Sequence, residues 1–339
     1  MRDPAFWWTE GSAAATLLAP AAALYGAVAA RRMARPGRTA PVAVICVGNF
    51  TMGGAGKTPT AIAIARHLMM AGRRPFFLSR GYGGRLAGPV RVDGHRAAAV
   101  GDEPLLLARI APTIVTRDRW AGAMMAADAG ADVVVMDDGL QNATLAKDFT
   151  IAVVDGRRGI GNGLVFPAGP LRAPLAVQLD HIDAVLVIGA KTGAITAATD
   201  RAIAAATARG VPVVRGELRP DPAAVAALAG KPVLAFAGIA DPDKFFATLE
   251  ASGIPAAVRA RFPDHHPYTQ AELAALLARA ERERLTPVTT EKDFARIGDD
   301  PAAAALLART VALPVTVAFL GEDFIGPAVV RAVRRHGIA

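Results

Sequence analysis

A glycine-rich segment, Gly53-Gly54-Ala55-Gly56-Lys57-Thr58, has the residue types that hold the phosphates of a nucleotide. It follows an apolar run at residues 42–47 and precedes a helical pattern at 60–71, which is the strand, loop and helix order of a P-loop. Glycines let backbone N–H groups turn toward phosphate oxygens, and the helix N-terminus adds partial positive charge. We expect Lys57 to reach the β- and γ-phosphates and the Thr58 hydroxyl to ligate Mg²⁺.

The spacing of these glycines differs from the general pattern G-x-x-x-x-G-K-[ST], which has glycine where this chain has Thr51. The segment follows the variant G-G-x-G-K-[ST] instead. Partner-regulated ATPases and GTPases of the partitioning or metallochaperone type have a similar loop. They usually carry a lysine directly before the two glycines, and this chain has Met52 there. That class therefore stays open as the alternative to an enzyme that transfers the phosphoryl group.

Apolar residues followed by two carboxylates at positions 133–138 predict a second element of the nucleotide site. In P-loop proteins an aspartate at the end of such a strand touches Mg²⁺ or the water around it. Many strands end in aspartate, so the pattern gains its meaning from the phosphate loop. We expect Asp137 or Asp138 to contribute to a magnesium site.

Apolar runs of β type alternate with helical segments along most of the chain. Continuous rather than alternating apolar runs are typical of strands covered on both faces. Strands that alternate with helices form βαβ units, so the predicted fold class is α/β with parallel sheets. The predicted strands are residues 42–47, 76–78, 133–136, 151–154, 184–188, 211–214, 233–237 and 315–319.

The length of 339 residues allows one large or two medium domains. A stretch rich in proline and glycine at 215–231 surrounds a short alanine helix, and a fresh strand follows it. We place a domain boundary near 215–230. The predicted units are an N-terminal apolar helix at 1–40, a P-loop domain at 41–220 and a smaller C-terminal α/β domain at 221–339.

Residues 11–30 carry no charge and would form a helix about 30 Å long, enough to span a bilayer. The stretch is mostly alanine, with Pro20 in the middle and one modest apolar face. Aromatic residues precede it and arginines follow it, at Phe6, Trp7, Trp8, Arg31, Arg32 and Arg35. Both kinds favour the membrane interface, with arginines on the cytoplasmic side.

We therefore expect this helix to lie in the interface of the membrane. A spanning helix and a helix packed on the domain are the alternatives. A cleaved signal peptide is disfavoured, because its basic region should come before the apolar stretch rather than after it.

The composition, with 53% hydrophobic and 20% charged residues, allows a substantial core and argues against disorder. The net charge of +8 fits an anionic partner, or simply a solvated surface rich in arginine. No interleaving of basic and aromatic residues supports nucleic-acid binding, so we expect none. The single cysteine, Cys46, lies in an apolar run and is expected to be buried and inert.

An ordered series of further motifs accompanies the loop and covers nearly the whole chain. In this combination the sequence resembles the tetraacyldisaccharide 4′-kinase family of lipid A synthesis, whose loop has the form T-x-G-G-x-G-K-T. The motifs are Val47-Gly48-Asn49-Phe50-Thr51, Ser79-Arg80-Gly81-Tyr82-Gly83, Val100-Gly101-Asp102-Glu103-Pro104, Asp137-Asp138-Gly139-Leu140-Gln141, Phe166-Pro167-Ala168-Gly169-Pro170-Leu171-Arg172-Ala173-Pro174, Phe262-Pro263-Asp264-His265-His266 and Thr290-Glu291-Lys292-Asp293.

The resemblance implies a fold and a reaction. The fold is a P-loop NTPase-like α/β/α sandwich with a second, smaller α/β/α domain and a membrane-associated N-terminal helix. The reaction transfers the γ-phosphoryl group of ATP, with Mg²⁺, to the 4′-hydroxyl of an acylated glucosamine disaccharide 1-phosphate. The enzyme would act as a monomer at the cytoplasmic face of the inner membrane, with its active site in the cleft between the domains.

The same resemblance makes Asp102 the catalytic base, with His265 as the residue that orients it or shares its proton. A sugar hydroxyl has a very high pKa, so a positioned base helps its attack. Without the resemblance, Asp102-Glu103-Pro104 would be interpreted as a helix start. His265 alone would be interpreted as a structural histidine, or as part of a metal site with Asp264 and His266.

Further roles follow for residues in these motifs. We expect Thr58, Glu103, Asp137 and Asp138 to supply the metal ligands, and Gln141 to contact the nucleotide or metal-bound water. Thr290–Asp293 follows a short β-type stretch and is suspected of a role near the nucleotide or hinge. The candidates for contact with the sugar or its phosphate are Asn49, Arg80, Tyr82, Arg117, Arg119 and Arg172, and each arginine could instead be a solvated surface residue.

Overall fold

The computed structural model describes residues 3–189, 195–298, 300, 303–321 and 325–336. Its main feature is a nine-stranded sheet with the order β13-β8-β7-β6-β1-β5-β2-β4-β3. The central strands from β8 to β4 pair in parallel, and the edge strands β13 and β3 are antiparallel to their neighbours. The strands are β1 (Ala43–Gly48), β2 (Pro75–Ser79), β3 (Val90–Arg91), β4 (Thr113–Val115), β5 (Val133–Asp137), β6 (Phe149–Asp155), β7 (Ala184–Ile188), β8 (Val213–Pro220) and β13 (Val315–Leu320).

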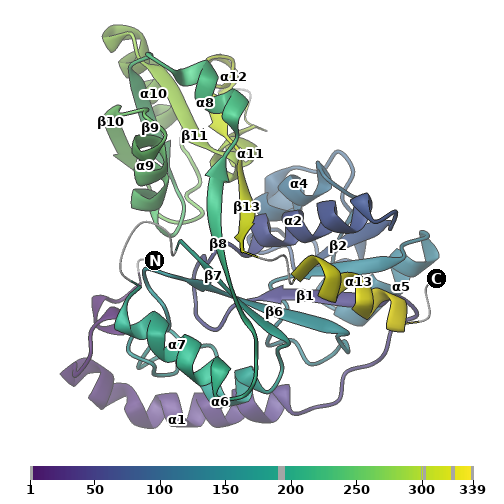
Figure 1. Ribbon diagram of the computed structural model, residues 1–339. Coiled ribbons are helices and arrows are strands. Elements are labelled where there is room, and N and C mark those ends of the chain that lie inside the picture. The colour runs from purple at the N-terminus through teal and green to yellow at the C-terminus, as the bar shows by residue number, and fades with distance from the viewer. Residues whose placement is uncertain (1–2, 190–194, 299, 301–302, 322–324, 337–339) are drawn as a thin grey trace.

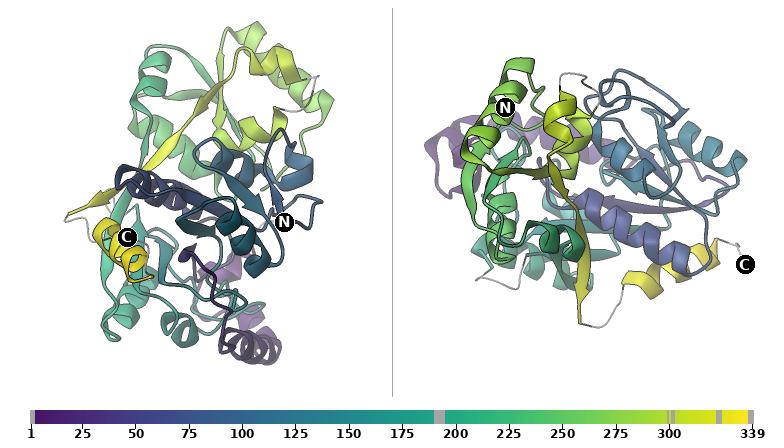
Figure 2. Two further views of the ribbon diagram at one scale, coloured as in Figure 1. Left: turned by 90° about the vertical axis from the view of Figure 1, so that its right-hand side faces the viewer. Right: turned by 90° about the horizontal axis from the view of Figure 1, so that it is seen from above.

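Helices cover both faces of this sheet, which explains why β1, β5, β6 and β7 are buried at every residue. One face packs against α2 (Lys57–Met70), α4 (Asp102–Ala108) and α13 (Ile325–Arg335), and α13 lies beside α2 (Figure 2). The other face packs against α5 (Arg119–Asp128), α6 (Leu175–Leu179) and α7 (Ala197–Thr207). A short helix, α3 (Ala97–Val100), precedes α4.

The second sheet is smaller, wholly parallel and ordered β10-β9-β11-β12. Its strands are β9 (Val233–Ala237), β10 (Ala256–Arg261), β11 (Thr286–Thr290) and β12 (Val311–Leu313). The helices α8 (Pro222–Leu228) and α9 (Pro242–Ala251) contribute to the core on one face, and α10 (Gln270–Glu283), α11 (Glu291–Ile297) and α12 (Ala304–Leu307) to the core on the other. The predicted class, an α/β/α sandwich with a second, smaller α/β/α unit, is confirmed.

The C-terminal segment returns to the large sheet, which differs from the expected domain at 221–339. Strand β13 pairs along its whole length with β8, and the two strands rise together from the large sheet toward the smaller one (Figure 1). Val329 and Val333 of α13 then join the same core as α2. The apolar run at 315–319 could not reveal this, because strands of either sheet have the same character.

All eight predicted strands are present, within shifts of a few residues at their ends. The structure adds β3, β4, β10 and β12, which are short or partly exposed, and β11, of which the sequence had shown only a short β-type stretch before Thr290. Strand β13 was expected to be covered on both faces, but it is an antiparallel edge strand with mostly half-buried residues. Strand β8 extends to Pro220, into the stretch rich in proline and glycine where we had placed the domain boundary.

The N-terminal segment folds as a 3₁₀ turn, η1 (Ala5–Trp8), and the helix α1 (Ala13–Met33). Helix α1 lies along the lower edge of the molecule beside α6 (Figure 1). Its buried residues are small except for Met33, whereas Leu17 is 82% and Leu24 70% exposed. By length and composition this one helix among the described residues is apolar enough to cross a membrane.

Trp7 differs from the position expected for a residue of the membrane interface. It is buried, and its indole N–H donates to the Pro167 carbonyl at 2.9 Å. Its ring also meets Phe166 edge-on, and Phe166 in turn contacts Tyr25 of α1. The aromatic group before α1 therefore serves in part to hold that helix to the loop around Phe166.

Because α13 completes the core of the large domain, Val333→Ala should destabilise that domain. Val333 is fully buried, so we expect the free energy of unfolding to fall by roughly 0.5–3 kcal/mol. Chemical denaturation should show this, and hydrogen exchange should place the faster opening in β1 and β6. Arg331→Ala, an exposed residue of the same helix, is the matched control. Equal stability of the two variants would show that α13 does not complete this core.

Candidate active site

The candidate site lies at the carboxyl ends of the central parallel strands, where α/β folds bind their ligands. The loops that leave β1, β2 and β5 carry the glycine-rich segment, Arg80 with Tyr82, and Asp138. The smaller domain reaches the same edge, since Lys244 of α9 pairs with Asp155 at the end of β6. Residues distant in the sequence thus meet at the edge where the resemblance implied the active site.

The glycine-rich loop has the backbone that a P-loop needs. Gly53 and Gly56 have positive φ angles of 89° and 96°, a region that favours glycine. Gly56 precedes the first residue of α2, and a Cβ atom there would lie 2.8 Å from Ile188. Lys57 is buried at the helix start, and its ammonium donates to the Gly53 carbonyl at 3.2 Å. Burial lowers the pKa of Lys57, while the Asp138 carboxylate opposes that shift.

Asn49 lies beneath the loop rather than at a surface that a sugar could touch. The residue is fully buried, and its side-chain amide donates to the same Gly53 carbonyl at 3.1 Å. Gln141 donates to the Asn49 backbone carbonyl at 2.8 Å and to Gln178 at 2.7 Å. Both residues therefore brace the phosphate loop. The full burial of Asn49 differs from the substrate contact expected of it, whereas the contact of the half-buried Gln141 with nucleotide or metal-bound water stays a prediction.

Asp137 and Thr58 form the part of the site that best fits Mg²⁺. The Thr58 hydroxyl donates to Oδ2 of Asp137 at 2.9 Å, and Oδ1 of Asp137 is buried with no hydrogen-bond partner. An orphaned carboxylate oxygen beside a P-loop hydroxyl suits a hard cation that prefers oxygen ligands. Burial, and then the neighbouring carboxylates of Glu103 and Asp138, raise the pKa of Asp137 to about 7.

Asp138 is occupied by cations of the protein. Arg172 donates to both of its carboxylate oxygens, at 2.6 and 3.1 Å, and the Lys57 ammonium lies 3.8 Å away. Burial would raise the pKa of Asp138, but the charges of Lys57 and Arg172 hold it well below its usual range. Arg172 also donates to the Thr51 carbonyl, so this arginine faces the loop and Asp138. Both oxygens of Asp138 are thus taken by cations of the protein, whereas Oδ1 of Asp137 has no partner.

Asp102 and His265 are brought together from the two domains, as the resemblance implied. Asp102 is the first residue of α4, and its Oδ2 lies 3.3 Å from Nδ1 of His265, which precedes α10. Burial opposes the shift, yet the hydrogen bond from His265 and the charges of Lys292 and Arg296 lower the pKa of Asp102. The same hydrogen bond raises the pKa of His265.

Glu103 and the Thr290–Asp293 motif meet at the same interface. Lys292 of α11 donates to the Glu103 carboxylate at 2.5 Å, and Thr290 caps the start of α11. Asp293 is fully buried and accepts from the backbone N–H of Gly238. The sequence had suggested a role near the nucleotide or hinge, and the structure places this motif against α4.

Arg296 was missed in the sequence, although it donates to Asp102 at 2.5 Å. Its only signal was its position four residues after Lys292, which puts both side chains on one helix face.

The remaining candidate residues for substrate contact divide into exposed and buried ones. Arg80 and Arg117 are exposed, and Tyr82 is 66% exposed with its ring 5.1 Å from that of His265. Arg119 is buried, donates to the Thr116 carbonyl and keeps a buried Nε without a partner. Burial, and the nearby charge of Arg80, lower the pKa of Arg119 to about 10.

His266 and the single cysteine have structural roles, whereas His265 contacts Asp102. His266 lies 3.0 Å from Glu272 and stacks on Phe262, which packs against the core of the smaller domain. Among the described residues, no group of three or more His, Cys, Asp or Glu side chains is placed to hold a metal ion. Cys46 is buried, and burial raises the pKa of its thiol to about 11.

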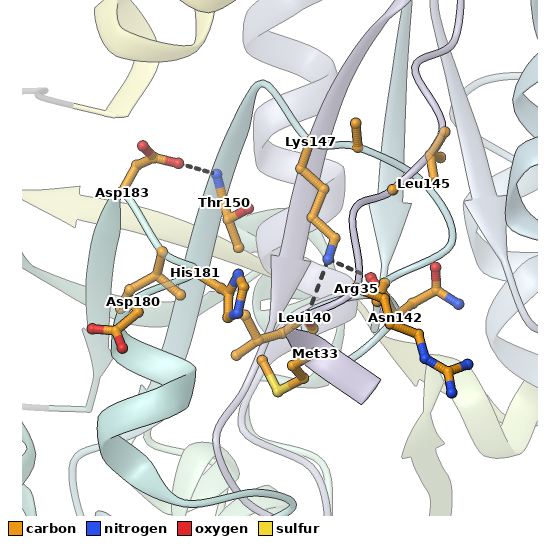
Figure 3. A pocket seen from close by; sticks show the side chains of 14 residues that line it. Met33, Arg35, Leu140, Asn142, Leu145, Lys147, Thr150, Asp180, His181 and Asp183 are labelled. Carbon is orange, nitrogen blue, oxygen red and sulfur yellow. Dashed lines mark hydrogen bonds between the residues drawn. The ribbon is translucent and has the colours of Figure 1, made fainter. Parts of the chain in front are cut away.

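A polar cavity of about 270 Å³ lies behind the loop that carries Asp138 and Gln141 (Figure 3). Lys147 and His181 both line this cavity. The Lys147 ammonium donates to the backbone carbonyls of Leu140 and Asn142 at 3.1 and 2.6 Å. The loop after β5 is therefore held by two cations. Lys147 binds its backbone at Leu140 and Asn142, and Arg172 binds the Asp138 side chain.

Known proteins resemble this chain along nearly its whole length. The sequence pattern of the LpxK family, described as tetraacyldisaccharide-1-P 4′-kinase, matches residues 14–333. The tetraacyldisaccharide 4′-kinase of Methylobacterium nodulans is 60% identical over 326 residues, which cover 95% of this chain and 93% of the relative. The one from Rhodopseudomonas palustris (strain BisA53) is 56% identical over 324 residues, covering 95% and 93%.

A solved structure has the same fold. The crystal structure of the "apo" form of LpxK from Aquifex aeolicus in complex with ATP has a TM-score of 0.73 and 23% identity. The match covers 94% of this chain and 99% of the other.

The raised pKa of Asp137 predicts that Mg²⁺ binding depends on pH. A carboxyl with a pKa of about 7 is protonated below that pH and must lose its proton to ligate the ion. The affinity for Mg²⁺ with a non-hydrolysable ATP analogue should rise from about pH 6 to about pH 8. Calorimetry in buffers of different ionisation enthalpy would measure the proton released.

Asp137→Asn should bind Mg²⁺ more weakly and with little pH dependence between those values. Asp128→Asn, which removes the same charge from an exposed site on α5, should behave as wild type. An affinity of the wild type that does not change over this range would contradict the assignment of Asp137 as a ligand.

Proposed function

The chain belongs to the LpxK family of tetraacyldisaccharide-1-P 4′-kinases, and we propose that it transfers the γ-phosphoryl of ATP to the 4′-hydroxyl of a tetraacylated glucosamine disaccharide 1-phosphate in lipid A biosynthesis. The observation that carries this function is the Asp102–His265 pair beside a complete P-loop. A partner-regulated ATPase needs the loop but has no use for an acid–histidine pair that can take a proton from an acceptor hydroxyl.

The residues of the loop hold the donor nucleotide. The N–H groups of Gly53–Thr58 and the start of α2 face its phosphates, and Lys57 balances charge on the phosphoryl group that moves. Thr58 and Asp137 would hold Mg²⁺, with Glu103 beside them. The ion supplies charge neutralisation of the phosphate oxygens when it is bound.

The acceptor hydroxyl gives up its proton to the Asp102–His265 pair as its oxygen bonds to the γ-phosphorus, and the bond to the β-phosphate oxygen breaks to leave ADP. Phosphoryl transfer depends mostly on position and charge, so the proton can move late. Tyr82, whose ring lies 5.1 Å from that of His265, and the exposed Arg80 of the same loop would contact the sugar. The buried Arg119, whose Nε has no hydrogen-bond partner, would balance negative charge on the phosphoryl group that moves.

We also propose that α1 lies in the membrane interface at the cytoplasmic face of the inner membrane. Leu17, Leu24 and Val28 are exposed on the helix, and exposed arginines at 31, 32 and 35 follow. Large exposed apolar side chains followed by cations suit an apolar layer under anionic headgroups. A monomer suffices for the reaction, since both members of the Asp102–His265 pair come from one chain.

The function is tested by transfer from radiolabelled ATP to the tetraacylated disaccharide 1-phosphate, with Mg²⁺ in detergent. Wild type should form the bisphosphorylated lipid. Asp102→Ala should lose about 10²–10⁴-fold in kcat, as expected for removal of a positioned base. Lys57→Ala should lose at least about 10²-fold, because a charge aimed at the moving phosphoryl group is gone.

Arg309→Met, which breaks an exposed ion pair with Glu281 in the smaller domain, should keep wild-type activity. Wild-type protein that hydrolyses nucleotide freely but phosphorylates no acceptor would favour the partner-regulated ATPase instead.

The membrane proposal predicts that a double change of Leu17 and Leu24 to glutamate weakens binding to vesicles that contain anionic lipid. Two charges on the apolar face oppose its burial in the acyl region, so co-sedimentation should fall several-fold while the protein stays folded. Met70→Glu is the matched control, because Met70 is 80% exposed but lies on α2. Equal binding of all three proteins would show that α1 does not dock on the membrane.

A further inference from the structure

Helix α11 of the smaller domain presents two cations to the two carboxylates that begin α4. Lys292 pairs with Glu103, and Arg296 pairs with Asp102, each at 2.5 Å. The two cations are four residues apart on one helix face, and the two carboxylates are adjacent at a helix start. The smaller domain therefore meets the carboxyl edge of the large sheet through a matched double pair of charges.

Arg296 makes more of these contacts than an ion pair requires. Its Nη2 donates to Oδ2 of Asp102, and its Nη1 donates to Asp293 at 2.7 Å and to the Gly238 carbonyl at 3.1 Å. The side chain is 11% exposed, and that of Asp102 is 3% exposed. A buried guanidinium with its donors fixed on three acceptors has very little freedom, and so the carboxylate that it holds has little freedom either.

The same bonds connect Arg296 to His265. Oδ2 of Asp102, which Arg296 holds, is the oxygen 3.3 Å from Nδ1 of His265. The Gly238 carbonyl, which Arg296 also holds, accepts from the backbone N–H of His265 at 3.1 Å. His265 has a left-handed φ of 53°, so its backbone depends on such a fixed neighbour. One guanidinium thus fixes the carboxylate and the turn that carries the histidine.

We propose that Arg296 is a positioning residue that assembles the Asp102–His265 pair and clamps the smaller domain onto α4. The proposal rests on the function proposed above. Its physical reason is that catalysis by oriented groups is lost steeply with small displacements, so a misplacement of about 1 Å costs about 10²-fold in rate. Arg296 joins the two halves of the pair through 2.5 Å and 3.1 Å bonds, without touching the reacting atoms itself.

A purely structural role is the competing explanation, because Arg296 also neutralises the buried Asp293. That carboxylate has other donors, namely the backbone N–H of Gly238, the Tyr268 hydroxyl and the Thr290 hydroxyl. Arg296→Lys keeps the positive charge near Asp293 and Asp102 but cannot bridge all three acceptors in one plane. Arg296→Met removes the charge and keeps much of the side-chain volume.

The test is a double-mutant cycle between Arg296 and His265, read as kcat and as KM for Mg-ATP and for the lipid acceptor. Arg296→Met should lower kcat about 10²-fold with little change in KM for Mg-ATP, and Arg296→Lys should fall between it and wild type. In a His265→Ala background, Arg296→Met should cost little more, since the pair is already lost. Arg309→Met again serves as the control.

An equal loss in both backgrounds would overturn the positioning role, because a general structural defect multiplies with the loss of His265. The thermal unfolding of each variant shows whether it folds. If Arg296→Met does not fold, the cycle is measured with Arg296→Lys in its place. Solution scattering should show a larger radius of gyration for Arg296→Met, and an unchanged one would overturn the clamp. Wild type that transfers nothing would overturn the proposed function and with it the catalytic half of this proposal, whereas the scattering still decides the clamp.

Discussion

The parallel direction of the central strands is the constraint on which the rest of this structure depends. Because β1, β2, β5 and β6 run the same way, their following loops gather at one edge of the sheet. That edge collects the phosphate loop, Asp137, Asp138 and Asp155 within one region. The arrangement concentrates negative charge where a polyphosphate must bind, so the protein also has to bring cations to the same edge.

Those four cations come from three separate parts of the chain, and each one is matched to a particular carboxylate. Arg172 and Lys57 hold Asp138, whereas Lys292 and Arg296 arrive from the smaller domain to hold Glu103 and Asp102. Asp137 is left with one orphaned oxygen and a raised pKa. Buried charges need partners, so among these four described carboxylates we propose Asp137, with its unpartnered oxygen, as the ligand for an ion.

The sequence was enough to predict the loop, the class of fold and the Asp102–His265 pair, because apolar runs, glycine spacing and a family resemblance each carry that information locally. It could not predict which sheet takes the strand at 315–320, since sheet membership is decided by packing far along the chain. The sequence also could not show that the Asn49 side chain lies beneath the phosphate loop, because a motif does not say which side of a loop a side chain occupies. Arg296 lies 194 residues from Asp102, and no spacing rule joins them.

The loop from Val165 to Ala173 links α1 to the phosphate site. At one end Phe166 packs on Tyr25 of α1, and the Pro167 carbonyl accepts from Trp7. At the other end Arg172 holds Asp138 and the Thr51 carbonyl. A lipid substrate would have its acyl chains in the bilayer and its reacting hydroxyl at the phosphate, so the proposed docking of α1 on the membrane would require a fixed distance between this helix and the phosphate loop. A short proline-rich segment that is anchored at both ends can fix that distance, because proline restricts the backbone conformations of the segment.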